Sequence, residues 1–207
     1  MSNYLGLNNY RALVTGAAGG IGRACAIELA RAGCHVHCVD LNVARLQATA
    51  ALVRAACHDG REFHYHSASV VEYKHIAKTI QGAGFGEGPD VLVLAHGVRG
   101  GQPIWEMSEA EWQRMVEINL TGTFHCMRAA TELWRRSAAP GVIIPIASIT
   151  GFIGNGSQFH NAHYAASKAG VVGLVKAAAI ELAPYQIRVN AVAPGPVETP
   201  MIEEFRS

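Results

Sequence analysis

The sequence predicts an α/β fold in which helices cover both faces of a parallel sheet, that is, a doubly wound sheet. Short apolar runs alternate with longer stretches of helical periodicity, which is typical of successive strand–helix units. A glycine-rich turn directly follows the first apolar run. The expected strands are Ala12–Val14, His35–Val39, Phe63–His66, Val91–Ala95, Val142–Ala147 and Ile187–Val192.

Two helices are predicted to start at capping boxes. Ser69 is followed by Glu72 and Ser108 by Glu111, so that a hydroxyl and a carboxylate can satisfy free amides of the first turn. A longer helix is expected over residues 163–183, which are apolar on most sides although a surface helix normally has a polar face. This helix and the one over residues 109–136 are therefore expected to contact a second subunit in a homodimer or homotetramer. Burial wholly within the chain's own domain is the alternative.

Composition and charge exclude several classes of function. The 207 residues are 50% hydrophobic and 16% charged, which fits a single domain over residues 1–207. The formal net charge of +1, without blocks of like charge, indicates neither a nucleic-acid nor an anionic-membrane partner. There is no apolar run of the ~20 residues of a membrane span, no signal-peptide pattern, and no CxxC pair among five cysteines. A soluble protein of the reducing cytoplasm is expected.

The glycine-rich turn predicts a dinucleotide site. Gly16, Gly19, Gly20, Ile21 and Gly22 follow Thr15 at the end of the first strand and open a helix. Glycines allow the tight turn and the close approach of a pyrophosphate, to which the helix N-terminus offers free amides.

Asp40 ends the second expected strand, at about the ~20-residue spacing of an acid that binds the adenosine ribose. A carboxylate there would repel a 2′-phosphate, and Leu41 offers no arginine to receive one. NAD is therefore expected as the cofactor. The alternative for Asp40 is a helix cap for the stretch that starts near Asn42.

Tyr164 and Lys168 lie four residues apart, on one face of the expected helix. A phenol has a pKa near 10, and a neighbouring ammonium favours the phenolate, which suits proton exchange with a substrate hydroxyl. Ser148 stands just past the fifth strand, where open parallel sheets place their ligands.

From about Tyr10 to Met201 the chain resembles the short-chain dehydrogenase/reductase family. The motifs occur in the family's order: Thr15-Gly16…Gly20-Ile21-Gly22, Asn119 in Ile-Asn-Leu-Thr-Gly, Ser148 in Ala-Ser-Ile-Thr-Gly, Tyr164…Lys168, and Arg188-Val-Asn-Ala-Val-Ala-Pro194-Gly195. The resemblance implies a Rossmann sheet with strand order 3-2-1-4-5-6. It also implies an NAD-dependent oxidoreductase that interconverts a secondary alcohol and a ketone.

The resemblance assigns roles to the candidate catalytic residues. Tyr164 would be the general acid/base, Ser148 would polarise the substrate oxygen, and Lys168 would hold the nicotinamide ribose and lower the tyrosine pKa. Asn119 would distort its helix and fix a water that relays protons. The candidate cofactor-binding residues are Gly16, Gly19, Gly20, Ile21, Gly22, Asp40, Ala95, Gly97, Tyr164, Lys168, Pro194, Gly195, Val197 and Thr199.

The sequence departs from the family in several places. The usual Asn-Asn-Ala-Gly run is Leu-Ala-His-Gly at 94–97, so the asparagine support of the central sheet is missing. Ser69 stands where an aspartate usually holds the adenine. The spacing from Ser148 to Tyr164 is long, so the loop 151–161 must bulge. The chain ends at Ser207, before the substrate-covering helix and the seventh strand of relatives.

The remaining histidines and tryptophans are given structural roles. His35/His37 and His64/His66 have a spacing that metal sites use, but no cluster completes either pair, and no metal is expected. His160 and His163 precede Tyr164 and are interpreted as solvated loop residues, with substrate contact as the alternative. The tryptophans (Trp105, Trp112 and Trp134) are expected to be core or interface anchors.

Two other functions stay open beside the alcohol/ketone oxidoreductase. One is a catalytically impaired dinucleotide-binding sensor or scaffold, which the altered run at 94–97 and the short C-terminus favour. The other is a nucleotide-sugar epimerase, for which no chain is left to form a sugar domain. The substrate cannot be predicted from the sequence.

Overall fold

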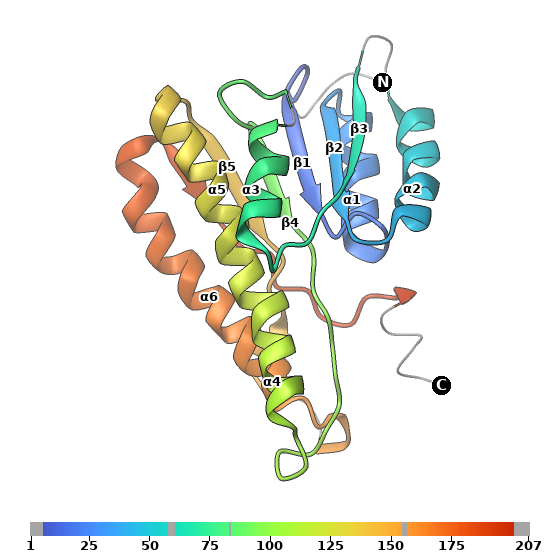
Figure 1. Cartoon of the computed structure of the whole chain (residues 1–207), viewed down its shortest axis with the longest axis vertical. Helices are drawn as coiled ribbons and strands as arrows, with labels where there is room; N and C mark the ends of the chain where they lie inside the picture. Colours follow the sequence, from blue (N-terminus) through green and yellow to red (C-terminus); the bar gives the residue numbers. More distant parts are fainter. Residues whose placement is uncertain (1–5, 58–60, 83, 155–156, 201–207) are drawn as a thin grey trace.

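The six predicted strands form one parallel sheet in the order β3-β2-β1-β4-β5-β6, which confirms the predicted fold class (Figure 1). This computed structural model describes residues 6–57, 61–82, 84–154 and 157–200. Expectations that depend on residues 1–5 or 201–207 lie outside this range. The strands are β1 (Arg11–Thr15), β2 (His35–Asp40), β3 (Phe63–Ser67), β4 (Val91–Leu94), β5 (Gly141–Pro145) and β6 (Ile187–Val189).

The α-helices of the described residues pack on the two faces of the sheet or lie beyond its carboxyl edge (Figure 1). They are α1 (Gly20–Arg31), α2 (Val43–Ala56), α3 (Tyr73–Gly82), α4 (Glu109–Val116), α5 (Gly122–Ser137) and α6 (Ala162–Leu182). One core cluster contains the buried side chains of α1 and α2, and the other contains those of α3, α5 and α6. Along β1, Leu13 belongs to the second cluster, whereas its neighbours Ala12 and Val14 belong to the first. The continuous apolar run of β1 thus follows from burial on both faces.

One of the two predicted capping boxes is present in part: its serine caps the helix, whereas the Glu111 carboxylate accepts from Arg114. Ser108 caps α4, and its Oγ accepts a hydrogen bond of 3.1 Å from the Glu111 amide. The other prediction was wrong, because α3 begins at Tyr73, too far along the chain for Ser69 to be its N-cap. The segment after β3, which includes Ser69, instead lines a cavity.

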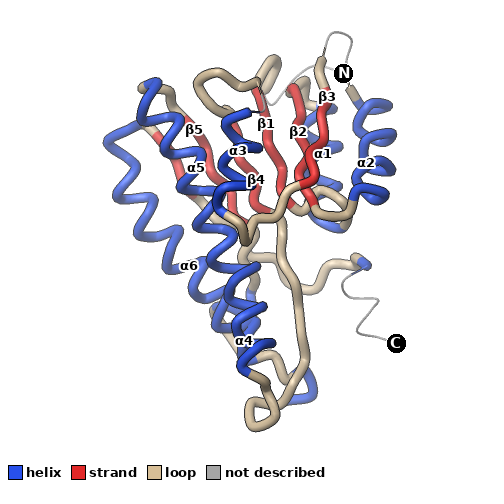
Figure 2. Tube along the Cα trace, viewed as in Figure 1, coloured by secondary structure: helices blue, strands red, loops and turns tan. Residues whose placement is uncertain are grey.

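The carboxyl ends of all six strands lie at one edge of the sheet, and the connections that leave this edge are drawn as tan tubes in Figure 2. The connection after β4 runs beyond the sheet before it reaches α4 (Figure 1). A bridge between Ile146 and Val192 continues the pairing of β5 and β6 toward the same edge. A parallel sheet concentrates its loops in this way because every strand points in the same direction.

The tryptophans divide between the core and the surface. Trp134 is 1% exposed and donates from Nε1 to the Pro89 carbonyl at 2.8 Å, as expected of a core anchor. Trp105 and Trp112 are exposed, so the core reading was wrong for both. Within the described ranges, every helix is too short or too polar to span a bilayer.

Candidate active site

A cavity of about 430 Å³ lies at the carboxyl edge of the sheet, and segments that follow all six strands contribute to its wall. It contains every expected cofactor-binding residue except Gly22, and it also contains Ser148. Gly22 lies beneath the turn, where an added Cβ would come within 2.2 Å of the Gly16 carbonyl oxygen. Its role is close packing of α1 on the turn.

The turn between β1 and α1 has the geometry of a phosphate cradle. Gly16 and Gly20 have φ of +67° and +54°, in the left-handed region that favours glycine. The α1 N-cap is Gly19, no side chain caps its first turn, and that turn holds no acidic residue. The free amides and the positive end of the helix dipole therefore face the cavity, as binding of a pyrophosphate requires.

Asp40 lines the cavity at the end of β2 and is held by two backbone amides. Its Oδ2 accepts from the Ala18 amide at 3.1 Å and its Oδ1 from the Asn42 amide at 3.0 Å. Asn42, which accepts from the Arg45 amide at 2.9 Å, is the cap of α2. The alternative reading of Asp40 as the helix cap is therefore wrong, and its carboxylate is fixed beside the glycine-rich turn.

Tyr164, Lys168 and Ser148 meet at the other end of the same cavity. The Lys168 Nζ lies 5.8 Å from the centroid of the Tyr164 ring and donates to the Ile146 carbonyl at 2.7 Å. Ser148 is buried, and its Oγ accepts from the Thr150 amide at 3.2 Å. Two short 3₁₀ turns, Ile149–Gly151 and Ser157–Phe159, lie within the long connection from Ser148 to α6.

Comparison with known proteins agrees with this geometry. The family model described as short chain dehydrogenase matches residues 10–207. The mouse (3R)-3-hydroxyacyl-CoA dehydrogenase is 38% identical over 99% of this chain and 80% of its own. The chain belongs to the short-chain dehydrogenase family. It is therefore an oxidoreductase of hydroxyl and keto groups, and the cofactor of the family is a nicotinamide dinucleotide.

Other relatives of this short-chain dehydrogenase include both cofactor types. A 3-oxoacyl-[acyl-carrier-protein] reductase of Staphylococcus aureus is 39% identical over 93% of this chain and 76% of its own. The structure of an NAD⁺-bound xylitol dehydrogenase superposes with a TM-score of 0.88 at 31% identity, covering 97% of this chain and 75% of its own. That of an actinorhodin polyketide ketoreductase variant with NADPH has a TM-score of 0.87 at 37% identity, covering 96% and 74%.

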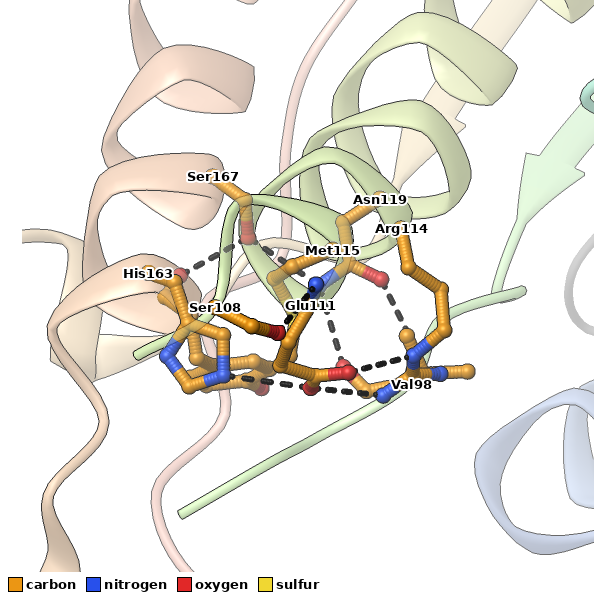
Figure 3. A network of polar contacts seen from close by, with 9 residues as sticks. Val98, Ser108, Glu111, Arg114, Met115, Asn119, His163 and Ser167 are labelled. Atoms are coloured by element: carbon orange, nitrogen blue, oxygen red, sulfur yellow. Dashed lines mark hydrogen bonds and ion pairs between the residues drawn. The ribbon is translucent and has the colours of Figure 1, made fainter. Parts of the chain in front are cut away.

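Asn119 lies behind the cavity of this dehydrogenase and connects three segments (Figure 3). It sits in a π-helical turn, Glu117–Thr121, between α4 and α5, which is the expected helix distortion. Its Oδ1 accepts from the Val98 amide at 2.8 Å, and its Nδ2 donates to the Val98 carbonyl and to Ser167 Oγ, both at 3.0 Å. Ser167 Oγ in turn donates to the Tyr164 carbonyl at 2.8 Å. The position of the tyrosine helix therefore depends on this buried amide.

The interpretation of His163 as a solvated loop residue was wrong, because its side chain is 0% exposed. Its Nε2 lies 3.3 Å from Glu111 Oε1, which joins α6 to α4 beside the Asn119 cluster (Figure 3). The Arg114 guanidinium, with a smaller contribution from His163, lowers the pKa of Glu111. His160 is exposed and meets the Trp105 ring edge-on.

Arg45 and His96 are among the cavity-lining residues that sequence reasoning missed. Arg45 follows a predicted helix start and carries no local motif that would place it at the cavity. His96 stands in the run at 94–97 that departs from the family, and that departure was the available signal.

Lys168 is 5% exposed, and burial lowers its pKa from 10.5 to about 8. Burial of the ammonium therefore lowers the free energy of unfolding by its full amount below about pH 8. This loss of stability is relieved between about pH 8 and 10.5, where the folded protein has lost the proton and the unfolded chain retains it. We expect the free energy of unfolding of the wild type, relative to Lys168→Met, to rise by about 2 to 3 kcal/mol from about pH 7 to about pH 10. Urea unfolding of both proteins at the two pH values measures this difference, and a pH-independent difference would contradict it.

Proposed function

We propose that this chain catalyses the NAD(H)-dependent interconversion of a secondary alcohol and a ketone, as a single domain over residues 1–207. The observation that supports the proposal is the continuity of the cavity, in which the glycine-rich turn and Asp40 lie at one end and Ser148, Tyr164 and Lys168 at the other. A dinucleotide needs such an extended site, with its phosphates at a helix N-terminus and its reactive ring at the acid/base groups.

Each polar group of the site has a distinct proposed task. Tyr164 exchanges a proton with the substrate oxygen, Ser148 donates a hydrogen bond to that oxygen, and Lys168 binds the nicotinamide ribose with its ammonium near the phenol. The cofactor, when bound, supplies or accepts the hydride. The segment from Pro194 to Thr199 lines the nicotinamide end, and Asn119 acts as a positioning residue through Val98 and Ser167.

Substitution Tyr164→Phe tests the proposed general acid/base. Removal of the hydroxyl is expected to lower kcat by about 10²-fold or more, because only the proton-transfer group is lost. The dissociation constant for NADH, measured by fluorescence, should change by less than about twofold, since the ring still lines the cavity. Turnover is measured over a ketone panel that includes a 3-oxoacyl thioester.

Tyr185→Phe, at an exposed position beyond α6, is the matched control and should have wild-type activity. Near-normal turnover by Tyr164→Phe would contradict the mechanism. NADH binding by the wild type without turnover of any substrate would favour the sensor or scaffold alternative.

The Asp40 carboxylate supports the preference for NAD, because it stands where it would repel a 2′-phosphate. Arg45 lines the same end of the cavity and offers a guanidinium once that charge is removed. We expect Asp40→Asn to lower the ratio of kcat/KM for NAD to that for NADP by about tenfold or more, equivalent to about 1.4 kcal/mol. The double variant Asp40→Asn/Arg45→Gln is the control and should gain less affinity for NADP. An unchanged ratio in Asp40→Asn would contradict the assignment.

A homodimer or homotetramer through α4, α5 and α6 is part of the proposal. The Ile180 side chain on α6 is 80% exposed, and Phe124, Met127 and Leu174 line a groove between α5 and α6. A second copy would remove this apolar surface from water. Light scattering should give a multiple of 22.0 kDa for the wild type and a lower mass for Ile180→Glu. Leu52→Glu, on α2, is the control that should keep the assembly. A monomeric wild type would contradict this part.

A further inference from the structure

The segment 95–98, which follows β4, lies between the two ends of the site. At one end, the Ala95 amide donates to the Thr15 carbonyl at 3.2 Å, and a Cβ on Gly16 would come within 2.5 Å of the backbone nitrogen of His96. At the other end, Val98 forms both of its backbone hydrogen bonds with Asn119. The position of this segment therefore sets the distance between the glycine-rich turn and the catalytic groups.

The side chain of His96 leaves this segment and connects two neighbouring elements. Its Nδ1 lies 2.7 Å from the Thr15 Oγ1, at the end of β1, and its Nε2 lies 3.4 Å from the Thr123 Oγ1, in the first turn of α5. The residue is 9% exposed, and its exposed part faces the cavity that is lined by Lys168. A support of the central strands is thus present at the run 94–97, although the sequence departs from the family there.

The donors and acceptors around His96 determine its tautomer. The Thr123 hydroxyl has one proton and donates it to the Asn119 carbonyl at 2.8 Å, so its oxygen accepts from the imidazole Nε2–H. The imidazole Nδ1 then carries the lone pair and accepts from the Thr15 hydroxyl. The hydrogen bonds run in one direction, from Thr15 through His96 and Thr123 to the backbone of the π-helical turn.

A neutral imidazole is required for this arrangement. A second proton would occupy Nδ1, and the Thr15 hydroxyl would retain only the Val93 carbonyl, at 3.5 Å, as an acceptor. Burial, together with the charge of Lys168, lowers the pKa of His96 to about 3. The titratable side chains that line the cavity together with His96 are Asp40, Arg45, Tyr164 and Lys168.

We propose that His96 is a positioning residue. As a neutral imidazole with its proton on Nε2, it connects the end of β1 to the π-helical turn that contains Asn119. It thereby holds the glycine-rich turn and the catalytic end of the cavity at the spacing that a nicotinamide dinucleotide needs. This inference rests on the proposed function for its effect on turnover, but its effect on NADH binding and stability does not require turnover.

Two substitutions separate the hydrogen bonds of His96 from its volume. His96→Leu removes both bonds and leaves the Thr15 and Thr123 hydroxyls without the imidazole as a partner. His96→Gln stays neutral and offers a carbonyl oxygen as acceptor and an NH2 group as donor. We expect His96→Leu to weaken NADH binding by about tenfold and to lower kcat by about tenfold to a hundredfold, because small displacements of a reacting group are costly. His96→Gln should recover most of both losses.

The two ends of the bridge are tested separately. Thr15→Val should mainly raise the NADH dissociation constant and the KM for NAD, whereas Thr123→Val should mainly lower kcat, because it releases the turn that holds Asn119. A double-mutant cycle of Thr15→Val with His96→Leu should show strong coupling in NADH affinity. Thr79→Val, on α3 and outside the cavity wall, is the matched control for loss of a threonine hydroxyl, and its NADH affinity and turnover should be unchanged.

The measurements are NADH fluorescence titration, thermal melting and steady-state kinetics over about pH 6 to 9. The proposal would be overturned if His96→Leu kept the wild-type NADH affinity and turnover. It would also be overturned if His96→Gln, at an equal melting temperature, lost as much affinity and turnover as His96→Leu. If His96→Leu does not fold, the two threonine variants decide the question: the proposal requires that Thr15→Val mainly weakens NADH binding and that Thr123→Val mainly lowers kcat. If the wild type binds NADH without turnover, the proposed function fails, whereas additive NADH affinities in the cycle would overturn the role of His96 alone.

Discussion

The contact of β1 with β4 at the carboxyl edge of the sheet is the constraint on which the site depends. The strands pair in register, and at their ends the backbone of Gly16 lies directly against Ala95 and His96, where a single added Cβ would meet atoms at 2.5 to 2.6 Å. Gly22 packs against the turn from the other side, where an added Cβ would lie 2.2 Å from the Gly16 carbonyl oxygen. Backbone packing of this kind leaves no room for side chains, so the amides of the turn face the cavity.

A second constraint is the burial of charge beside this packed edge. Lys168 is almost completely buried and donates to the Ile146 carbonyl, and burial destabilises its ammonium relative to water. The proposed function gives this buried cation a role, the binding of the nicotinamide ribose beside Tyr164. The neutral state of His96 belongs to the same balance, since a second cation next to Lys168 would be unfavourable in so small a volume.

The fold could be predicted from local patterns because each strand is apolar, short and followed by a helical stretch. Asp40 was placed at the cavity from its distance along the chain to Gly16, and the structure puts it there. Local patterns failed where a side chain had two possible partners. Ser69 has the pattern of a helix cap, but α3 starts at Tyr73. His163 lies in a polar stretch, yet the packing of α4 against α6 buries it beside Glu111.

The amino-acid sequence by itself determined the order of strands and helices, the glycine turn, and the residue types available for acid/base chemistry, because these depend on periodicity and on local backbone geometry. Only the tertiary structure decided that His96 bridges Thr15 and Thr123, that Arg45 lines the cavity, and that Asn119 holds Val98 and Ser167. Thr15 and His96 lie 81 positions apart along the chain, and Asn119 and Ser167 lie 48 apart. Their contacts follow from the pairing of strands and the packing of helices, which no local spacing encodes.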